Sequence, residues 1–206
     1  MYSHSHGYSK GMRIMEMGVL QYGLQHSRGM ACGLWSVSPG IALLSLDLLG
    51  IIAIFATLMN EHTDKQLLLD CRYLRMAAIW AENSYCVRRK VGAIIVKDRM
   101  IISDGYNGTP AGFENVCEDD SGHTKPYVLH AEANAITKVA RSNNSSEGAT
   151  LYVTASPCME CAKLIIQSGI KRVVFHELYR IADGIELLSH SGVECVHIPE
   201  IIENVR

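Results

Sequence analysis

The chain has 206 residues, of which 48% are hydrophobic and 19% charged, and its formal net charge is −2 at pH 7. This length and apolar content are sufficient for one globular domain with an appendage. A charge so close to zero gives no compositional reason to expect a nucleic-acid partner. The seven cysteines are odd in number and irregularly spaced, unlike the disulfide framework of a secreted protein, so we expect a reducing, cytoplasmic compartment.

The N-terminal part of the chain differs in composition from the rest. We predict an extension over residues 1–58 and a folded domain over 59–206, with Met59 as its start. Residues 40–59 form a nearly continuous apolar run of membrane-spanning length, interrupted by Asp47. A carboxylate at the centre of a spanning helix costs about 2.5–3.5 kcal/mol. A membrane anchor and a docking helix stay open, but an extension foreign to the domain is the favoured interpretation.

From Gln66 onward the hydrophobic pattern becomes regular. Apolar residues recur at helical spacing from Leu69 to Trp80. A hairpin of two strands follows, and then an aperiodic segment at 107–128 of the length typical of lids and binding loops. The predicted strands are 91–97, 100–108, 149–154, 172–176 and 192–198, and the later helices are 131–141, 158–168 and 181–190. This alternation indicates an α/β sheet that opens with a hairpin and becomes parallel later.

Two short motifs at predicted helix starts carry metal-ligating side chains. The stretch "SPCMEC" provides Cys158 and Cys161 at C-x-x-C spacing, which by itself fits zinc, a redox disulfide or chance. The stretch "HAE" adds His130, and three protein ligands with an open fourth position are typical of catalytic zinc. Glu132 is then free to move protons between a zinc-bound water and a substrate. The pairing of H-x-E with P-C-x-x-C is the signature of zinc nucleobase deaminases.

Residues 66–200 resemble the deoxycytidylate (dCMP) deaminases of the cytidine deaminase superfamily. The stretches that carry the resemblance are "KVGAIIV", "SDGYNGTPAG", "YVLHAEANAI", "GATLYVTASPCMECAKLIIQSGIKRVVF" and the tyrosine of "HELYR". The resemblance implies a three-layer αβα fold around a mixed five-stranded sheet. It also implies hydrolysis of dCMP to dUMP with release of ammonia, a reaction that feeds dTMP synthesis. It does not extend to residues 1–58.

The resemblance also implies roles for individual residues. It makes Glu132 the proton shuttle as zinc-bound hydroxide attacks C4 of cytosine, and it assigns the zinc to His130, Cys158 and Cys161. Four further residues are implied in substrate binding: Asn107 at the sugar hydroxyl, Ala131, Arg141 near the nucleotide or a subunit interface, and Tyr179. For Asn107, Arg141 and Tyr179 a role in a turn, as a solvated charge or in packing stays open. The phosphate-binding cation is also open among Arg88, Arg89, Lys90 and Arg141.

A second, structural zinc is a further expectation. Cys86 and Cys117 lie where some family members use cysteines for such a site, and His123 is a third candidate ligand. A fourth ligand is missing, and buried or free thiols are the favoured alternative. Family members are typically hexamers that dCTP activates and dTTP inhibits, so we expect a homo-oligomer with these effectors.

Two alternatives to a dCMP deaminase stay open. One is another zinc-dependent nucleoside or nucleobase deaminase, although an enzyme acting on tRNA would need a basic face that the net charge does not indicate. The other is a non-catalytic, zinc-stabilised nucleotide-binding module. Glu132 argues against the second alternative, because a purely structural zinc site needs no proton shuttle.

Overall fold

The computed structural model describes residues 50–51, 65–179 and 182–200. The predicted extension over 1–58, its boundary at Met59 and almost all of the apolar run at 40–59 lie outside these residues. Within the described ranges, no helix combines the length and the apolar character that crossing a membrane requires.

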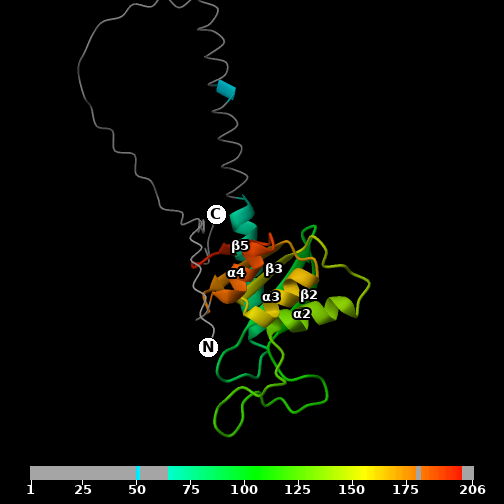
Figure 1. The fold of residues 1–206 in the computed structure, drawn as a ribbon, viewed down its shortest axis with the longest axis vertical. Coiled ribbons are helices and arrows are strands. Elements are labelled where there is room, and N and C mark those ends of the chain that lie inside the picture. The colour runs from blue at the N-terminus through cyan, green and yellow to red at the C-terminus, as the bar shows by residue number, and fades with distance from the viewer. Residues whose placement is uncertain (1–49, 52–64, 180–181, 201–206) are drawn as a thin grey trace, which may run out of the picture. The chain divides into compact units, whose positions relative to one another are not determined.

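A five-stranded sheet forms the centre of the domain, in the strand order β2-β1-β3-β4-β5 (Figure 1). The strands are β1 (Gly92–Lys97), β2 (Met100–Tyr106), β3 (Thr150–Ala155), β4 (Arg172–Glu177) and β5 (Glu194–His197). β1 is antiparallel to both β2 and β3, whereas β3, β4 and β5 run parallel. The two residues of the predicted hairpin turn, Asp98 and Arg99, have φ values of 49° and 63°, as a two-residue type I′ turn requires. The predicted mixed sheet is confirmed.

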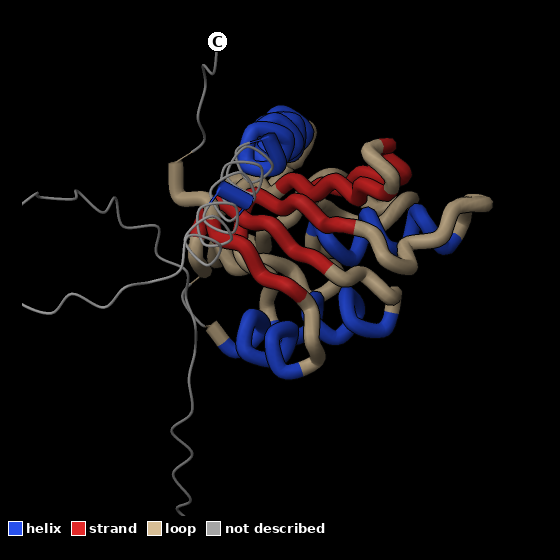
Figure 2. The backbone as a smooth tube through the Cα atoms, turned by 90° about the horizontal axis from the view of Figure 1, so that it is seen from above, coloured by secondary structure: helices blue, strands red, loops and turns tan. Residues whose placement is uncertain are grey.

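Helices cover both faces of this sheet, as Figure 2 shows. Residues 65–81 form a helix on one face, where Leu74 and Ala77 pack against Ile94 and Val174. The other face carries α2 (Ala131–Ala140), α3 (Met159–Gln167) and α4 (Asp183–His190). The sheet divides its side chains accordingly, since successive residues of a strand point to opposite faces. The predicted three-layer αβα fold is therefore confirmed.

A buried ion pair fixes the lone helix on its face of the sheet. Asp70, with a side chain 2% exposed, accepts hydrogen bonds from both terminal nitrogens of Arg172 at 2.9 and 2.7 Å. The hydroxyl of Tyr152 donates to the same carboxylate at 2.8 Å, and burial raises the pKa of Tyr152 so that this proton is retained. Pairing offsets the cost of burying the charge. The polar groups of this ion pair therefore stabilise the packing of the helix at residues 65–81 on the sheet. The candidate functional residues lie on the opposite face, where α2 and α3 begin.

Candidate active site

Three metal-ligating side chains meet where α2 and α3 begin. His130 is the N-cap of α2 and Cys158 the N-cap of α3, both with extended backbone, and Cys161 lies in the first turn of α3. The sulfur of each cysteine lies 3.4 Å from Nδ1 of His130. All three ligand atoms lie within 4.8 Å of one another, and in the described part of the chain this is the one group of three or more such residues. The fold thus brings together the three residues that the sequence analysis proposed as zinc ligands.

Local helix geometry explains why both cysteines face the histidine. Positions three apart share one side of a helix, so the N-cap thiol and the thiol of the first turn point the same way. The main-chain N–H groups of a helix start carry partial positive charge, which favours thiolates. Pro157, which is buried, enters this turn from β3. His130 is exposed, Cys158 half-buried and Cys161 buried, so the group opens to solvent on the histidine side.

Hydrogen bonds within the group shift the pKa values of its three side chains. Hydrogen bonds with Cys161 and His130 lower the pKa of Cys158 to about 3, whereas the hydrogen bond with Cys158 raises the pKa of Cys161. The bond to Cys158 also raises the pKa of His130. A thiolate, an imidazole nitrogen and a second thiol at these distances are the donors that Zn²⁺ prefers. The donor set therefore fits zinc, with one of four tetrahedral positions left for a non-protein ligand.

Glu132 lies against this group without being part of it. It is the second residue of α2, it is 4% exposed, and its carboxyl shares a hydrogen bond with Cys161. Burial raises the pKa of Glu132. A carboxyl whose pKa is displaced towards neutrality can both accept and return a proton under ordinary conditions. His130 and Glu132 thus extend from the same helix start, but His130 belongs to the metal-ligating group and Glu132 is suited to proton transfer.

Two glycines that the sequence reasoning did not single out bring the helix starts into place. A Cβ atom at Gly105 of β2 would lie 2.2 Å from the carbonyl oxygen of Ala131. A Cβ at Gly184 of α4 would lie 2.2 Å from the carbonyl oxygen of Pro157 and 2.8 Å from the carbonyl carbon of Cys158. An isolated glycine inside a helical pattern, as in "ADGIEL", is the signal that could have indicated such an approach.

The predicted substrate-binding residues lie in different places. The Asn107 amide accepts from the Val91 N–H and donates to the Arg89 carbonyl, both at 2.8 Å, so it joins the end of β2 to the segment before β1. Ala131 is 0% exposed in the first turn of α2. Arg141 is the C-cap of α2, about 16.5 Å along the helix axis from His130. Within one chain, Arg141 is therefore not brought to the metal-ligating group.

Tyr179 lies just beyond β4, beside the segment that leads into α3. Its main-chain N–H donates to the Ser156 hydroxyl at 2.7 Å, two residues before Cys158. The residue is 46% exposed, and the guanidinium carbon of Arg89 lies 5.7 Å from the centroid of its ring. Tyr179 is thus placed close to the metal-ligating group by the backbone that carries Cys158.

The residues proposed for a second zinc are only partly brought together. The side chains of Cys86 and Cys117 are buried and share a hydrogen bond, and burial raises the pKa of Cys117 to about 12. His123 is exposed, with its Nδ1 3.8 Å from Asp119, and it forms no three-residue group with these thiols in the part of the chain described. The second zinc stays a prediction, and His123 would have to move to complete it.

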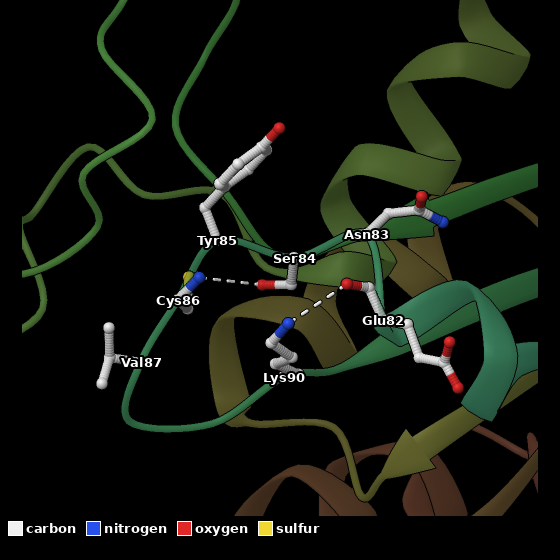
Figure 3. Close-up of a pocket in the computed structure, with 7 residues that line it drawn as sticks. All are labelled: Glu82, Asn83, Ser84, Tyr85, Cys86, Val87 and Lys90. Carbon is white, nitrogen blue, oxygen red and sulfur yellow. Dashed lines mark hydrogen bonds between the residues drawn. The ribbon is translucent and has the colours of Figure 1, made fainter.

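A pocket of ≈ 640 Å³ borders the loop before β1 (Figure 3). In it, Lys90 donates to the carbonyl oxygen of Glu82 at 3.1 Å, and Ser84 accepts from the Cys86 N–H at 3.2 Å. The lining residues are Glu82, Asn83, Ser84, Tyr85, Cys86, Val87 and Lys90. The metal-ligating residues do not line it, so this pocket and the candidate active site are separate features.

The fold and the donor set together define a class, the zinc-dependent deaminases with a cytidine deaminase-like α/β fold. The family described as "Cytidine and deoxycytidylate deaminase zinc-binding region" matches residues 68–177. The chain belongs to this family. The predicted family, the zinc-dependent hydrolase and zinc as the cofactor are thereby confirmed.

Similar proteins are named deoxycytidylate or dCMP deaminases. A deoxycytidylate deaminase of Enterobacteria phage T4 is 36% identical over 170 residues, which cover 62% of this chain and 88% of that protein. The crystal structure of the dCMP deaminase of cyanophage S-TIM5 in complex with dCMP and dUMP has 47% sequence identity and a TM-score of 0.61. That match covers 62% of this chain and 94% of the cyanophage chain.

We predict that Gly184→Ala lowers zinc occupancy. The added methyl group would meet main-chain atoms of Pro157 and Cys158, which cannot rotate away as a side chain would. Metal analysis of the purified protein, repeated after a mild chelator challenge, measures the effect. Gly108→Ala is the matched control, because the nearest atom to its Cβ lies 3.9 Å away, on the ring of Tyr106. Equal zinc retention in the two variants would contradict the positioning role of Gly184.

Proposed function

We propose that this protein hydrolyses dCMP to dUMP and ammonia. The observation that carries the proposal is the meeting of His130, Cys158 and Cys161 beside the buried carboxyl of Glu132. The T4 relative is named a deoxycytidylate deaminase, and the cyanophage enzyme was solved with dCMP and dUMP, which supports a pyrimidine nucleotide as the substrate.

In this proposal Nδ1 of His130 and the two cysteine sulfurs hold the zinc. When bound, zinc polarises a water molecule and lowers its pKa towards neutrality. The two helix starts supply partial positive charge that stabilises the thiolates. The exposed histidine side of the group is where a cytosine ring would enter, while the buried Cys161 side excludes bulk water.

Glu132 carries out the proton transfers. It takes a proton from the attacking water as the water oxygen bonds to C4, and gives it to N3, which makes the ring more electrophilic. It then takes the remaining proton from the new C4 hydroxyl, whose oxygen becomes the C4 carbonyl, and gives it to the amino group, whose bond to C4 breaks to release ammonia. The raised pKa of the buried carboxyl suits this alternation between acceptor and donor.

Several finer points rest only on the resemblance, on the cysteine pattern or on the composition of the chain. The contact of Asn107 with the sugar, regulation by dCTP and dTTP, the hexamer and the cytoplasmic location stay proposals. The same holds for the division of the chain at residue 59.

A substrate panel tests the proposed reaction. We expect ammonia release from dCMP, and markedly less from CMP, deoxycytidine and dCTP, with all activity lost on zinc chelation and restored by added Zn²⁺. Equal turnover of deoxycytidine and dCMP would contradict a nucleotide deaminase. Activity on an unphosphorylated base alone would favour the other zinc-dependent deaminases.

Glu132→Ala is predicted to keep zinc and to lower kcat by about 10³-fold, as expected for losing a general acid–base group. Steady-state kinetics and metal analysis of the same preparation check both halves of this statement. Glu160→Ala is the control, because Glu160 also lies in the first turn of a ligand-bearing helix, but its side chain is 78% exposed and pairs with Lys163. Near-normal turnover by Glu132→Ala would refute the proton role.

A further inference from the structure

The guanidinium of Arg89 is held beside the candidate active site by two different contacts. Its Nη2 forms an ion pair with Oε2 of Glu177, at the end of β4. Its carbon lies 5.7 Å from the centre of the Tyr179 ring. The arginine side chain is 35% exposed and the glutamate side chain 59% exposed, so solvent and solutes reach this pair.

Backbone contacts tie this pair to the residues around the metal-ligating group. The Ser156 N–H donates to the carbonyl of Glu177 at 2.8 Å, and the Ser156 hydroxyl accepts from the Tyr179 N–H at 2.7 Å. Cys158 follows Ser156 by two residues. On the other side, the carbonyl of Arg89 accepts from the Asn107 amide at 2.8 Å. Arg89 therefore lies between two segments that carry predicted substrate-binding residues, Asn107 and Tyr179.

The chemistry of this arrangement suits a phosphate group. A guanidinium carries five N–H donors in a planar fork, so an ion pair at one nitrogen leaves donors for the oxygens of a second anion. An aromatic face under the guanidinium limits its rotation and keeps the fork oriented. A nucleoside monophosphate brings a dianionic group at a fixed distance from its base, which is what such a cation would recognise.

The other three candidate cations lie among, or bond to, residues away from the metal-ligating group. Arg88 donates to the Thr124 hydroxyl at 3.3 Å, in the long loop, and Lys90 donates to the Glu82 carbonyl in the separate pocket. Arg141 lies at the far end of α2. Arg89 differs from these three cations in its contacts within the described residues. Its guanidinium lies over the ring of Tyr179, and the Tyr179 N–H bonds to Ser156, in the segment that carries Cys158.

We propose that Arg89 binds the 5′-phosphate of the substrate, with Tyr179 as its platform and Glu177 as a carboxylate that competes with the phosphate for the same guanidinium. This assignment rests on the proposed function and names the group that selects a nucleotide over a nucleoside. Arg89 is accordingly a specificity-determining residue, and Glu177 weakens binding of the substrate.

Opposite effects of two substitutions test this assignment. Arg89→Gln is expected to raise KM for dCMP by about 30-fold, the size of a lost charge-assisted hydrogen bond, and to leave kcat/KM for deoxycytidine nearly unchanged. Glu177→Gln removes the competitor and is expected to lower KM for dCMP by about 3-fold. An ion pair with a purely structural role predicts the reverse for Glu177→Gln, because either substitution would then loosen the same contact.

Further variants separate the sources of failure. Arg89→Lys should recover part of the affinity, since it keeps the charge but not the fork. Arg88→Gln is the matched control variant. A larger rise in KM for dCMP with Arg88→Gln than with Arg89→Gln would overturn the assignment. Calorimetric binding of dCMP to Glu132→Ala, with and without Arg89→Gln, gives a second readout that needs no turnover. If no cytidine compound is deaminated, the proposed function fails, and the calorimetric comparison still decides on Arg89.

Discussion

The close approach of two helix starts to the backbone around them is the constraint on which the site depends. α2 reaches β2 at Gly105, and the turn that opens α3 reaches α4 at Gly184, in each case so closely that a Cβ atom would meet a carbonyl oxygen. These contacts set the distance between His130 and the two thiols. The parallel arrangement of β3, β4 and β5 places the segments that follow β3 and β4 at the same edge, so Tyr179 bonds to Ser156, two residues before Cys158.

The two motifs divide the chemistry by their position in the first helical turns. In "CMEC", both cysteines face the metal because they lie three residues apart. In "HAE", the two-residue spacing sends the N-cap histidine towards the sulfurs and the glutamate into the protein beside Cys161. In the proposed reaction, the exposed and buried sides of the group differ in function: substrate would reach the metal-ligating group from the histidine side, and Glu132 would transfer protons on the buried side.

Much of the fold and of the metal-ligating group follows from local sequence signals. The strands and helices from residue 91 to 198 lie within about two residues of their predicted ends, because apolar periodicity and turn residues mark them clearly. His130, Cys158 and Cys161 could be grouped because two motifs, each at a strand-to-helix junction, match one zinc chemistry.

What the sequence could not provide are contacts that depend on three-dimensional packing. Asn107, just beyond β2, bonds through its side chain to the backbone of residues 89–91, which lead into the neighbouring strand β1. Arg141 shares a helix with His130 but lies at its other end, and His123 is directed to Asp119 rather than to the buried thiols. The stacking of Arg89 on Tyr179 joins residues 90 positions apart, for which no local pattern exists.

The proposed chemistry depends on a zinc ion held by one histidine and two cysteines, with the fourth position free for water or substrate. X-ray absorption at the zinc edge, combined with metal counting on the 206-residue chain, tests it most directly. We predict one zinc per chain at the site, with two sulfur neighbours at about 2.3 Å and two nitrogen or oxygen neighbours at about 2.0 Å. Three or four sulfur neighbours, or an unchanged spectrum after Cys158→Ser, would contradict it.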